Sequence, residues 1–572
     1  AVALGGTAVA SAFVLASGPK VACTPSAAPR WDEHVRARLR DAFADSGDAI
    51  AGASTTVMSA LDRRVTAWHD AYAQTCSDPE ASAAVRTCLD VRRFELDAVA
   101  DVIADGDTEV LTRALPMVAG LPGVEPCTRS PAQLAKVDPQ LLVGEAQQLR
   151  EKLAVARALG DAGRYDDAIA TARPVLERAA AIGHAAVHAE ANARLGELQV
   201  AASAPAEGAT LLEEAFFEAR EIGHDEVATE SSIALVATLG GQLARLDAVA
   251  PWVEHAEAAL QRWGSRELEA ALEKARGGIA LRSGDNADAV ARYARTVEIL
   301  AAAVDADDPR LADAIDALGI AEQLAQHWDI AIAHHERALV MREHAYGDAH
   351  PDVGYSLTNI ARALLEQGLE EPAIHHNEWV IAIDEAALGS DHLFTAIAHN
   401  NLGAAWGRLG EPAAAAEQFQ AARPGFERLG ADHPEVALVL TNIGQAALET
   451  GDYVTAAEVL EQALAIRERH FGPDHPATRA CAALLGTTAA SDGAHGRAVA
   501  SIERALAGDD PPAGYNDVDL VQLRITLAQS LLALRRRDDA SAALVVARKA
   551  IAALDDPPPR IVADADALAR AL

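Results

Sequence analysis

The sequence predicts an all-α protein built from stacked helical hairpins, and three repeated features support this fold class. A dipeptide recurs at intervals of 42, 42, 41 and 42 residues, a small or polar turn follows each one, and an alanine then recurs in register. This period is typical of supersecondary units that bury a core only by stacking. The dipeptides are Asp308-Pro309, His350-Pro351, His392-Leu393, His433-Pro434 and His475-Pro476, and the alanines are Ala331, Ala373, Ala415, Ala456 and Ala498.

Residues 393–434 illustrate the predicted unit. A first helix is expected over 393–408 and ends at Gly410, because glycine accepts the left-handed conformation common at helix ends. Pro412 lies where a second helix begins, at a position whose N–H has no intrahelical partner. Small alanines let the two helices approach closely, and larger side chains such as Phe419 fill the space to the neighbouring unit.

These residues resemble the tetratricopeptide repeat, and in particular the 42-residue form found in kinesin light chains. The boundary between repeats carries the resemblance: it reads QALAIRERHFGPDHP over 462–476 and recurs over 337–347. The resemblance is specific over 309–507 and looser upstream, where 163–168 reads as a repeat turn. It implies a superhelix (an α-solenoid) of about ten repeats.

Five segments are predicted along the 572 residues. They are a partial transmembrane helix or trimmed signal over 1–17, a cysteine-bearing helical region over 23–127, divergent helical repeats over 136–304, tetratricopeptide repeats of the 42-residue type over 305–507, and a terminal repeat and cap over 515–572.

The formal net charge of −35 argues against nucleic-acid binding, because neutralising phosphates needs a basic surface. Two interpretations of the acidic surface remain open. The carboxylates form solvated helix faces, or they give the chain a preference for basic peptides.

The first seventeen residues are uncharged and mostly apolar, and the first charge is Lys20. Seventeen residues lie at the short limit for a membrane span. The segment is expected to be the second half of a transmembrane helix. A signal peptide without its basic front and a core helix are the alternatives.

Four of the five cysteines, Cys23, Cys76, Cys88 and Cys127, lie in the first 127 residues. An even set beside a membrane segment suggests two disulfides and an oxidising compartment. We expect Cys76 to pair with Cys88 and Cys23 to pair with Cys127, although three connectivities exist and four free thiols are the alternative. The fifth, Cys481, is expected to be a small buried hydrophobe.

The amino-terminal region also resembles the membrane-proximal region of bacterial, especially myxobacterial, serine/threonine kinases. The resemblance is carried by RW at 30–31, by Trp68, Tyr72 and Cys76, and by LPGVEPC over 121–127. No glycine-rich loop, HRD or DFG motif is present, so no residue here is assigned phosphotransfer. The resemblance implies the sensor or docking part of such a kinase, in the bacterial inner membrane with the repeats outside the cytoplasm.

No catalytic, metal or cofactor motif occurs: GxxxxGK[ST], GxSxG, HExxH and CxxC are all missing from the sequence. We therefore predict no enzyme activity for this chain, no cofactor and no metal. The adjacent histidines at 334–335 and 375–376 are interpreted as variation between equivalent repeat positions.

Asparagine is the main candidate for ligand contact. Asn359, Asn401 and Asn442 occupy equivalent positions in the first helices of three successive repeats, and Asn400 is adjacent. An amide offers two donors and one acceptor, so such a series can bind the backbone of an extended peptide. Alternatively, the amides satisfy backbone groups between repeats. Arg362 and Arg408 would add contacts to an acidic group, or lie on a solvated helix face.

The sequence thus predicts a protein-interaction scaffold that binds a peptide or protein in the concave groove of a superhelix. Regulation of a membrane kinase is the functional context that the resemblance implies. The alternative is a free-standing periplasmic assembly factor. Membrane contact would run through residues 1–17.

Overall fold

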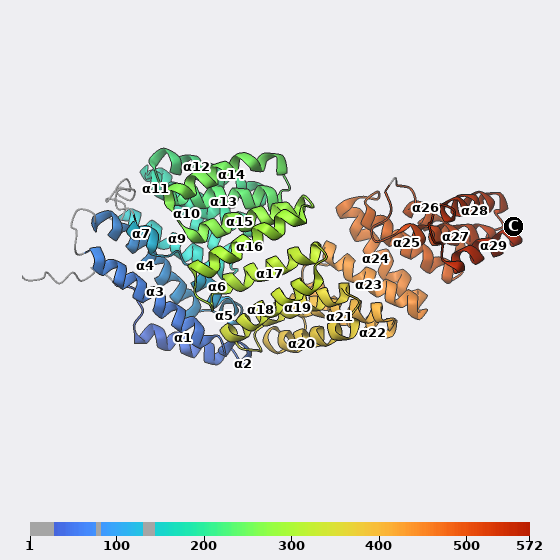
Figure 1. The fold of residues 1–572 in the computed structure, drawn as a ribbon, viewed down its shortest axis with the longest axis horizontal. Helices are drawn as coiled ribbons and strands as arrows, with labels where there is room; N and C mark the ends of the chain where they lie inside the picture. The colour runs from blue at the N-terminus through green and yellow to red at the C-terminus, as the bar shows by residue number, and fades with distance from the viewer. Residues whose placement is uncertain (1–27, 76–81, 130–143, 509) are drawn as a thin grey trace, which may run out of the picture.

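The computed structural model describes residues 28–75, 82–129, 144–508 and 510–572. Within these ranges the regular secondary structure is helical and no strand occurs (Figure 1), which confirms the predicted all-α class. Residues 1–17, Cys23 and Cys76 lie outside the described residues. None of the described helices is long and apolar enough to cross a membrane.

Residues 144–551 form ten helical hairpins in sequence, the number expected from the repeats. The final helix α29 (Pro559–Ala571) packs against the last hairpin. The hairpins are α9 (Glu145–Asp161) with α10 (Tyr165–Ile182), α11 (Ala185–Ala201) with α12 (Pro205–Ile222), α13 (Asp225–Ala237) with α14 (Leu246–Trp263), α15 (Arg266–Arg282) with α16 (Asn286–Ala303), α17 (Pro309–Leu324) with α18 (Trp328–Tyr346), α19 (Pro351–Glu366) with α20 (Glu370–Leu388), α21 (Leu393–Leu409) with α22 (Pro412–Glu427), α23 (Pro434–Thr450) with α24 (Tyr453–Phe471), α25 (Pro476–Ser491) with α26 (His495–Ala505), and α27 (Asp517–Ala533) with α28 (Arg537–Ile551).

The recurring dipeptide is a helix cap. The Nδ1 atom of His350 accepts a hydrogen bond from the backbone N–H of Asp352 at 3.1 Å, and His433 accepts one from Glu435 at 3.2 Å. The proline that follows His350 or His433 occupies the first helical turn, where its missing N–H leaves no bond unmade. The cap satisfies one of the amides that every helix start leaves without a partner.

A second repeated feature sets the spacing within each hairpin. At one position of the first helix a glycine or alanine faces a larger side chain of the second helix. A Cβ added at Gly403 would lie 2.7 Å from the Phe419 ring, and one at Gly444 would lie 2.5 Å from Leu460. The small residues are Gly319, Ala361, Gly403, Gly444 and Gly486, and the register-equivalent larger residues are His335, Asn377, Phe419, Leu460 and Ile502.

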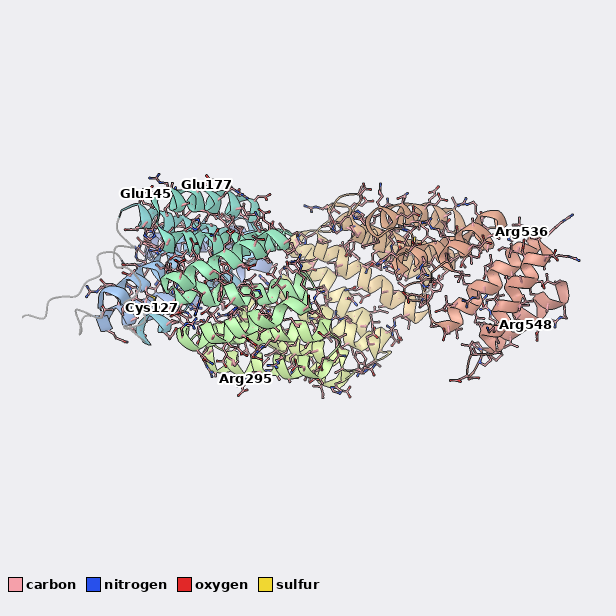
Figure 2. The ribbon with its side chains drawn as sticks, turned by 90° about the horizontal axis from the view of Figure 1, so that it is seen from above. Cys127, Glu145, Glu177, Arg295, Arg536 and Arg548 are labelled. Atoms are coloured by element: carbon pink, nitrogen blue, oxygen red, sulfur yellow. A yellow bond between two sulfur atoms is a disulfide. The ribbon has the colours of Figure 1, made fainter. Side chains whose placement is uncertain are left out.

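The first helices of successive hairpins contact one another more extensively than the second helices do. They therefore form the more closely spaced side of the stack, which is its inner side. We call the helices α9, α11, α13, α15, α17, α19, α21, α23, α25 and α27 the inner layer. Charged side chains project from the surface of the stack, as labelled for Glu177, Arg295 and Arg548 (Figure 2).

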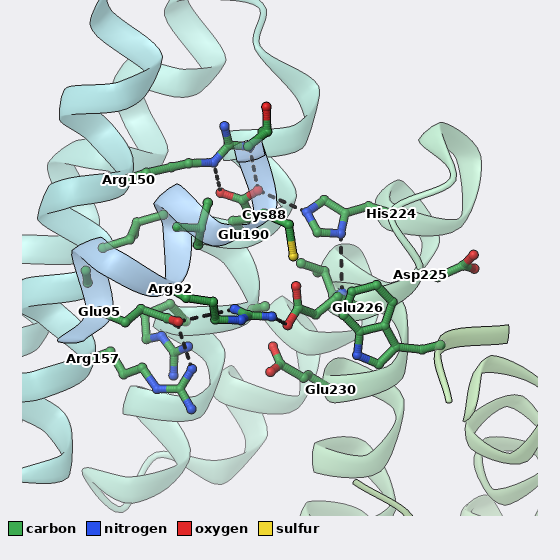
Figure 3. Close-up of a pocket in the computed structure, with 18 of the residues that line it drawn as sticks. Cys88, Arg92, Glu95, Arg150, Arg157, Glu190, His224, Asp225, Glu226 and Glu230 are labelled. Atoms are coloured by element: carbon green, nitrogen blue, oxygen red, sulfur yellow. Dashed lines mark hydrogen bonds and ion pairs between the residues drawn. The ribbon is translucent and has the colours of Figure 1, made fainter. Parts of the chain in front are cut away.

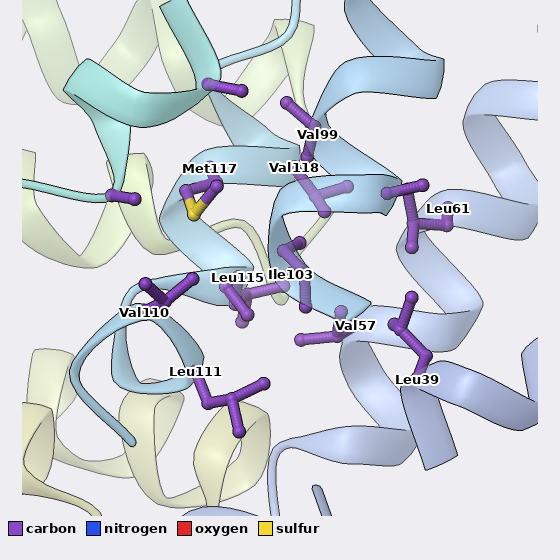
Figure 4. Packing of buried hydrophobic residues seen from close by; sticks show 14 of the residues in the cluster. Leu39, Val57, Leu61, Val99, Ile103, Val110, Leu111, Leu115, Met117 and Val118 are labelled. Carbon is purple, nitrogen blue, oxygen red and sulfur yellow. The ribbon is translucent and has the colours of Figure 1, made fainter. Parts of the chain in front are cut away.

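The amino-terminal region is built around an apolar core that includes Leu39, Leu61, Ile103 and Met117 (Figure 4). Its longest helices, α3 and α4, pack against each other. The helices are α1 (Glu33–Asp45), α2 (Asp48–Ala51), α3 (Ser54–Gln74), α4 (Ser82–Ala104), α5 (Thr108–Thr112), α6 (Ala114–Ala119) and α7 (Glu125–Arg129).

This region lies against the repeats rather than apart from them (Figure 1). Helix α4 packs on α9, while α6, α3 and α2 contact α17, α18 and α20, respectively. Tyr346 of α18 joins the apolar core of the amino-terminal region with 1% of its surface exposed. The first six hairpins and residues 28–129 therefore share a continuous interface.

The disulfide pairing expected from the sequence was wrong. Cys88 bonds to Cys127, with 5.7 Å between their Cα atoms, so neither the Cys76–Cys88 nor the Cys23–Cys127 pair forms. The packing of α7 on α4 brings these two residues together. The spacing of the cysteines favoured the shorter loop, because the packing of α7 on α4 cannot be inferred from that spacing. Cys481 is fully buried, as predicted, and burial raises the pKa of its thiol to about 11.

Replacing both Cys88 and Cys127 by alanine should lower the free energy of unfolding of the amino-terminal region by about 4 kcal/mol, the chain-entropy value for a loop of 39 residues. Thermal unfolding with and without reductant measures this loss. The matched control is Cys481→Ala, which should not change the response to reductant. Equal unfolding of the wild type in both conditions would contradict the prediction.

Gly403→Ala should destabilise the repeats by about 1–3 kcal/mol, because the new methyl group must displace the Phe419 ring. Gly407→Ala in the same helix is the control. A Cβ there comes no closer than 3.9 Å to a neighbour, so alanine should stabilise by up to about 1 kcal/mol through helix propensity. Urea unfolding followed by circular dichroism compares the two, and equal midpoints would contradict the assigned close contact.

Asp384 of α20 is 4% exposed, and no described residue gives its carboxyl group a hydrogen bond or ion pair. Burial raises its pKa from 3.8 to about 7. The folded state therefore binds the proton of Asp384 more tightly than the unfolded chain does. The protein is not destabilised by this residue below about pH 4, and its free energy of unfolding falls as the pH rises to about 7.

Asp384→Asn should accordingly raise the free energy of unfolding at pH 8 by about 2–4 kcal/mol, and the gain should vanish near pH 4. Unfolding midpoints across this pH range test the prediction. The exposed Asp391→Asn change should leave the midpoints unaltered. A gain that is the same at both pH values would show that charge is not its cause.

Candidate functional site

The exposed side of α19, α21 and α23 carries apolar side chains in a regular series. Tyr355, Ile397 and Leu438 occupy equivalent positions at intervals of 42 and 41 residues, and 51%, 36% and 40% of their respective surfaces are exposed. Phe394, on the same helix as Ile397, is 54% exposed. Each helix belongs to the inner layer, so the series crosses three hairpins on the inner side of the stack.

The predicted asparagines lie one helical turn after these apolar residues, because residues four apart share a helix face. Asn359 follows Tyr355, Asn401 follows Ile397, and Asn442 follows Leu438 at this spacing. We call the surface made by Tyr355, Ile397, Leu438, Asn401 and Asn442 the α19–α23 face.

The asparagines are not equivalent in their surroundings. Asn359 is 5% exposed, and its side-chain oxygen accepts a hydrogen bond from Arg362 at 3.3 Å. Asn442 donates from Nδ2 to Oδ1 of Asn400 across the hairpin boundary at 2.8 Å. That bond joins two side chains, whereas the alternative interpretation expected bonds from the asparagines to backbone groups. Asn401 is half-buried, and no described residue hydrogen-bonds to its side chain.

The two predicted arginines are exposed and lie near this face. Arg362 donates to the side-chain oxygen of Gln323 at 3.1 Å, and Arg408 pairs with Glu366 at 3.3 Å. Exposed ion pairs such as Arg408–Glu366 contribute little to stability. The guanidinium of Arg408 is therefore able to exchange its partner for an acidic ligand at small cost. Arg362 would have to give up its hydrogen bonds to the buried Gln323 and Asn359.

The exposed apolar residues of this face are the part that sequence reasoning missed. The signal was present, since Tyr355, Ile397 and Leu438 share the period of the asparagines. Apolar residues at helical spacing are ordinarily assigned to the core. Only the structure separates these three from the buried residues of the same helices.

A second site lies where α4 meets α9, α11 and the start of α13 (Figure 3). The guanidinium of Arg150 donates to both oxygens of Glu190, at 2.8 and 2.6 Å, and Nε2 of His224 lies 3.0 Å from the same carboxylate. Despite its burial, Glu190 has a pKa of about 2, because Arg150 and His224 stabilise its charge. The pKa of His224 is raised by its bond to Glu190, which outweighs burial.

A pair of arginines shares a second carboxylate in this pocket. Glu95 accepts from Arg92 at 3.2 Å and from Arg157 at 3.0 Å, and these charges lower its pKa although it is buried. Arg92 also bonds to Glu226. These residues come from separate helices far apart in sequence, which is why no sequence motif indicated the pocket.

The histidine pairs do not converge on a site. His335 is fully buried and bonds through Nδ1 to Asp316 at 2.6 Å, whereas Nδ1 of His376 lies 2.9 Å from the carbonyl of Pro372. Burial lowers the pKa of His334. Across the described part of the chain, no three histidine, cysteine, aspartate or glutamate side chains are grouped to hold a metal ion.

The chain was also compared with known proteins. Solved structures similar to the chain include the nearly identical TPR-like repeats of a kinesin light chain from Podosopora anserina (20% identity, 36% of this chain and 97% of that chain, TM-score 0.32) and BtubC (BKLC) from P. vanneervenii (19% identity, 43% and 93%, TM-score 0.32). The apo quorum sensor NprR from B. thuringiensis is also similar (13% identity, 59% and 92%, TM-score 0.41). Among curated proteins, none matches this sequence.

A family comparison identifies the hairpins directly. Residues 310–386, 394–469 and 439–510 match the family described as tetratricopeptide repeat. These ranges include α19, α21 and α23, and therefore the whole α19–α23 face. The hairpins over 310–510 are tetratricopeptide repeats, as their resemblance to the kinesin-light-chain form implied.

Proposed function

We propose that this chain is a protein-interaction scaffold and that the α19–α23 face binds its partner. The tetratricopeptide-repeat superhelix is a non-catalytic fold typical of such scaffolds. The observation that carries the proposal is the exposed series Tyr355, Ile397 and Leu438, in register on three successive inner-layer helices. Exposing an apolar series of this kind to water costs free energy, and a partner that covers the series recovers that free energy.

An extended peptide fits the spacing of this face. Packed helices lie about 8–10 Å apart, and a polyproline-type segment returns to the same side every third residue, after about 9 Å. A peptide that crosses α19, α21 and α23 therefore places one apolar side chain on each helix. Asn401 is positioned to bond its backbone, and Arg362 and Arg408 to bind an acidic group.

We further propose that the chain is the sensor or docking part of a bacterial inner-membrane serine/threonine kinase, with the repeats outside the cytoplasm. The Cys88–Cys127 disulfide supports an oxidising compartment. The predicted apolar segment over 1–17 supports a membrane anchor. The same disulfide also fits a free-standing periplasmic assembly factor.

The sequence encoded upstream of residue 1 distinguishes these two contexts. A kinase domain with a glycine-rich loop, HRD and DFG, followed by the first half of a membrane helix, supports the kinase context. A short basic segment that completes a signal peptide supports the assembly factor. Neither result bears on the α19–α23 face, which is tested separately.

Substitution of Ile397 and Leu438 by serine should weaken partner binding at least about ten-fold, since each removes a buried apolar contact worth about 1–2 kcal/mol. Partners are first captured with the full chain, and their affinities are then measured by calorimetry. Val340→Ser with Val454→Ser is the control, because both residues are exposed on second helices. Equal affinity of both double variants would contradict the proposal.

Asparagine substitutions separate binding from structure on the same face. Asn401→Ala should weaken binding with little change in melting temperature. Asn442→Ala should lower the melting temperature, because it removes the bond to Asn400. Parallel losses of binding and stability in both variants would favour a structural role for the whole series.

A further inference from the structure

The pocket between α4 and the first three hairpins encloses about 120 Å³. Its walls combine charged groups with apolar side chains that include Val91, Leu153 and Trp263. The amino-terminal region supplies one wall through α4, and the inner layer supplies the opposite wall (Figure 3).

Every arginine that lines the pocket already has a carboxylate partner. Among the acidic lining residues, Asp225 accepts from Arg262 at 2.7 Å. The pairs are Arg92 with Glu95 and Glu226, Arg150 with Glu190, Arg157 with Glu95, and Arg194 with Glu197. An anionic ligand would therefore have to displace a carboxylate from a formed pair.

Glu230 is the one lining carboxylate without such a partner among the described residues. No hydrogen bond or ion pair reaches its carboxylate, and Figure 3 draws none. Burial first, and then the nearby charge of Glu226, raise its pKa to about 7. Arg157 and Arg194 are near enough to lower this pKa in part, but neither is paired with Glu230. The pocket thus contains one acceptor without a bonded cation, whereas each of its arginines is already bonded to a carboxylate.

We propose that this pocket binds a small molecule with a protonated amine, whose N–H groups donate to the carboxylate of Glu230. The apolar remainder of the ligand packs against Val91, Leu153 and Trp263. Trp263 supplies an aromatic ring to the lining, and the face of such a ring attracts a cation through its quadrupole. The pocket volume of about 120 Å³ is slightly smaller than that of a cavity of about 150 Å³ that holds benzene, which limits the ring part of the ligand to about this size.

A bound amine would contact both α4 and α13, because the pocket is formed between them. It would therefore stabilise the contact between the amino-terminal region and the repeats by mass action. This site is distinct from the α19–α23 face, so failure of the peptide-binding proposal would leave the amine-binding proposal unaffected.

Benzylamine, benzyl alcohol and benzoate test the proposal on the full, oxidised chain, because they share a ring and differ in charge. Calorimetry should show benzylamine binding at least about ten-fold more tightly than the other two. Equal affinity of benzylamine and benzyl alcohol, tighter binding of benzoate, or no benzylamine binding at millimolar concentration would overturn it. This series needs no variant, so it does not depend on the folding of a mutant.

Glu230→Gln should reduce benzylamine affinity at least about ten-fold while leaving that for benzyl alcohol unchanged. Glu213→Gln, at an exposed position of α12, is the matched control and should bind benzylamine as the wild type does. Retained benzylamine affinity in Glu230→Gln would place the amine elsewhere and overturn the assignment of this carboxylate.

Discussion

The close approach of two helices within each hairpin is the constraint on which the rest of this structure depends. A glycine or alanine in the first helix gives room to a larger side chain from the second, as at Gly403 with Phe419 and Gly444 with Leu460. This contact sets the distance between paired helices, and repetition of the same contact sets the rise of the stack. The inner layer is a consequence, because equal hairpins stacked in one sense leave their first helices on the same side.

The repeats were predictable from sequence because each is specified by local chemistry. The His350 and His433 caps, the small residues and the terminal glycines recur at one period, and a period is visible without any long-range information. The Cys88–Cys127 pair and the pocket around Glu230 were not predictable in this way. They depend on how α4 lies on other helices, and a sequence without repeats offers no register from which to infer that packing.

The inner layer serves two different purposes along its length. Near α9, α11 and α13 it is covered by α4, and the contact includes buried ion pairs in which Glu95 and Glu226 accept from arginines. Near α19, α21 and α23 the same layer leaves Ile397 and Leu438 partly exposed. One repeated scaffold therefore supplies an internal interface at one end and an available surface farther along. Of the asparagines expected to bind a ligand there, Asn442 is bonded to Asn400, whereas no described residue bonds the side chain of Asn401.

The contacts of the amino-terminal region with α9, α17, α18 and α20 also have a mechanical consequence. A solenoid is elastic, because small rotations between neighbouring units add up along its axis. A rigid body attached to units that are not neighbours prevents these rotations from accumulating. The first six hairpins should therefore resist bending and stretching, whereas α21 to α29 should retain the compliance of an ordinary solenoid. Tension applied at the carboxyl end would extend that part first and leave the braced part in its resting shape.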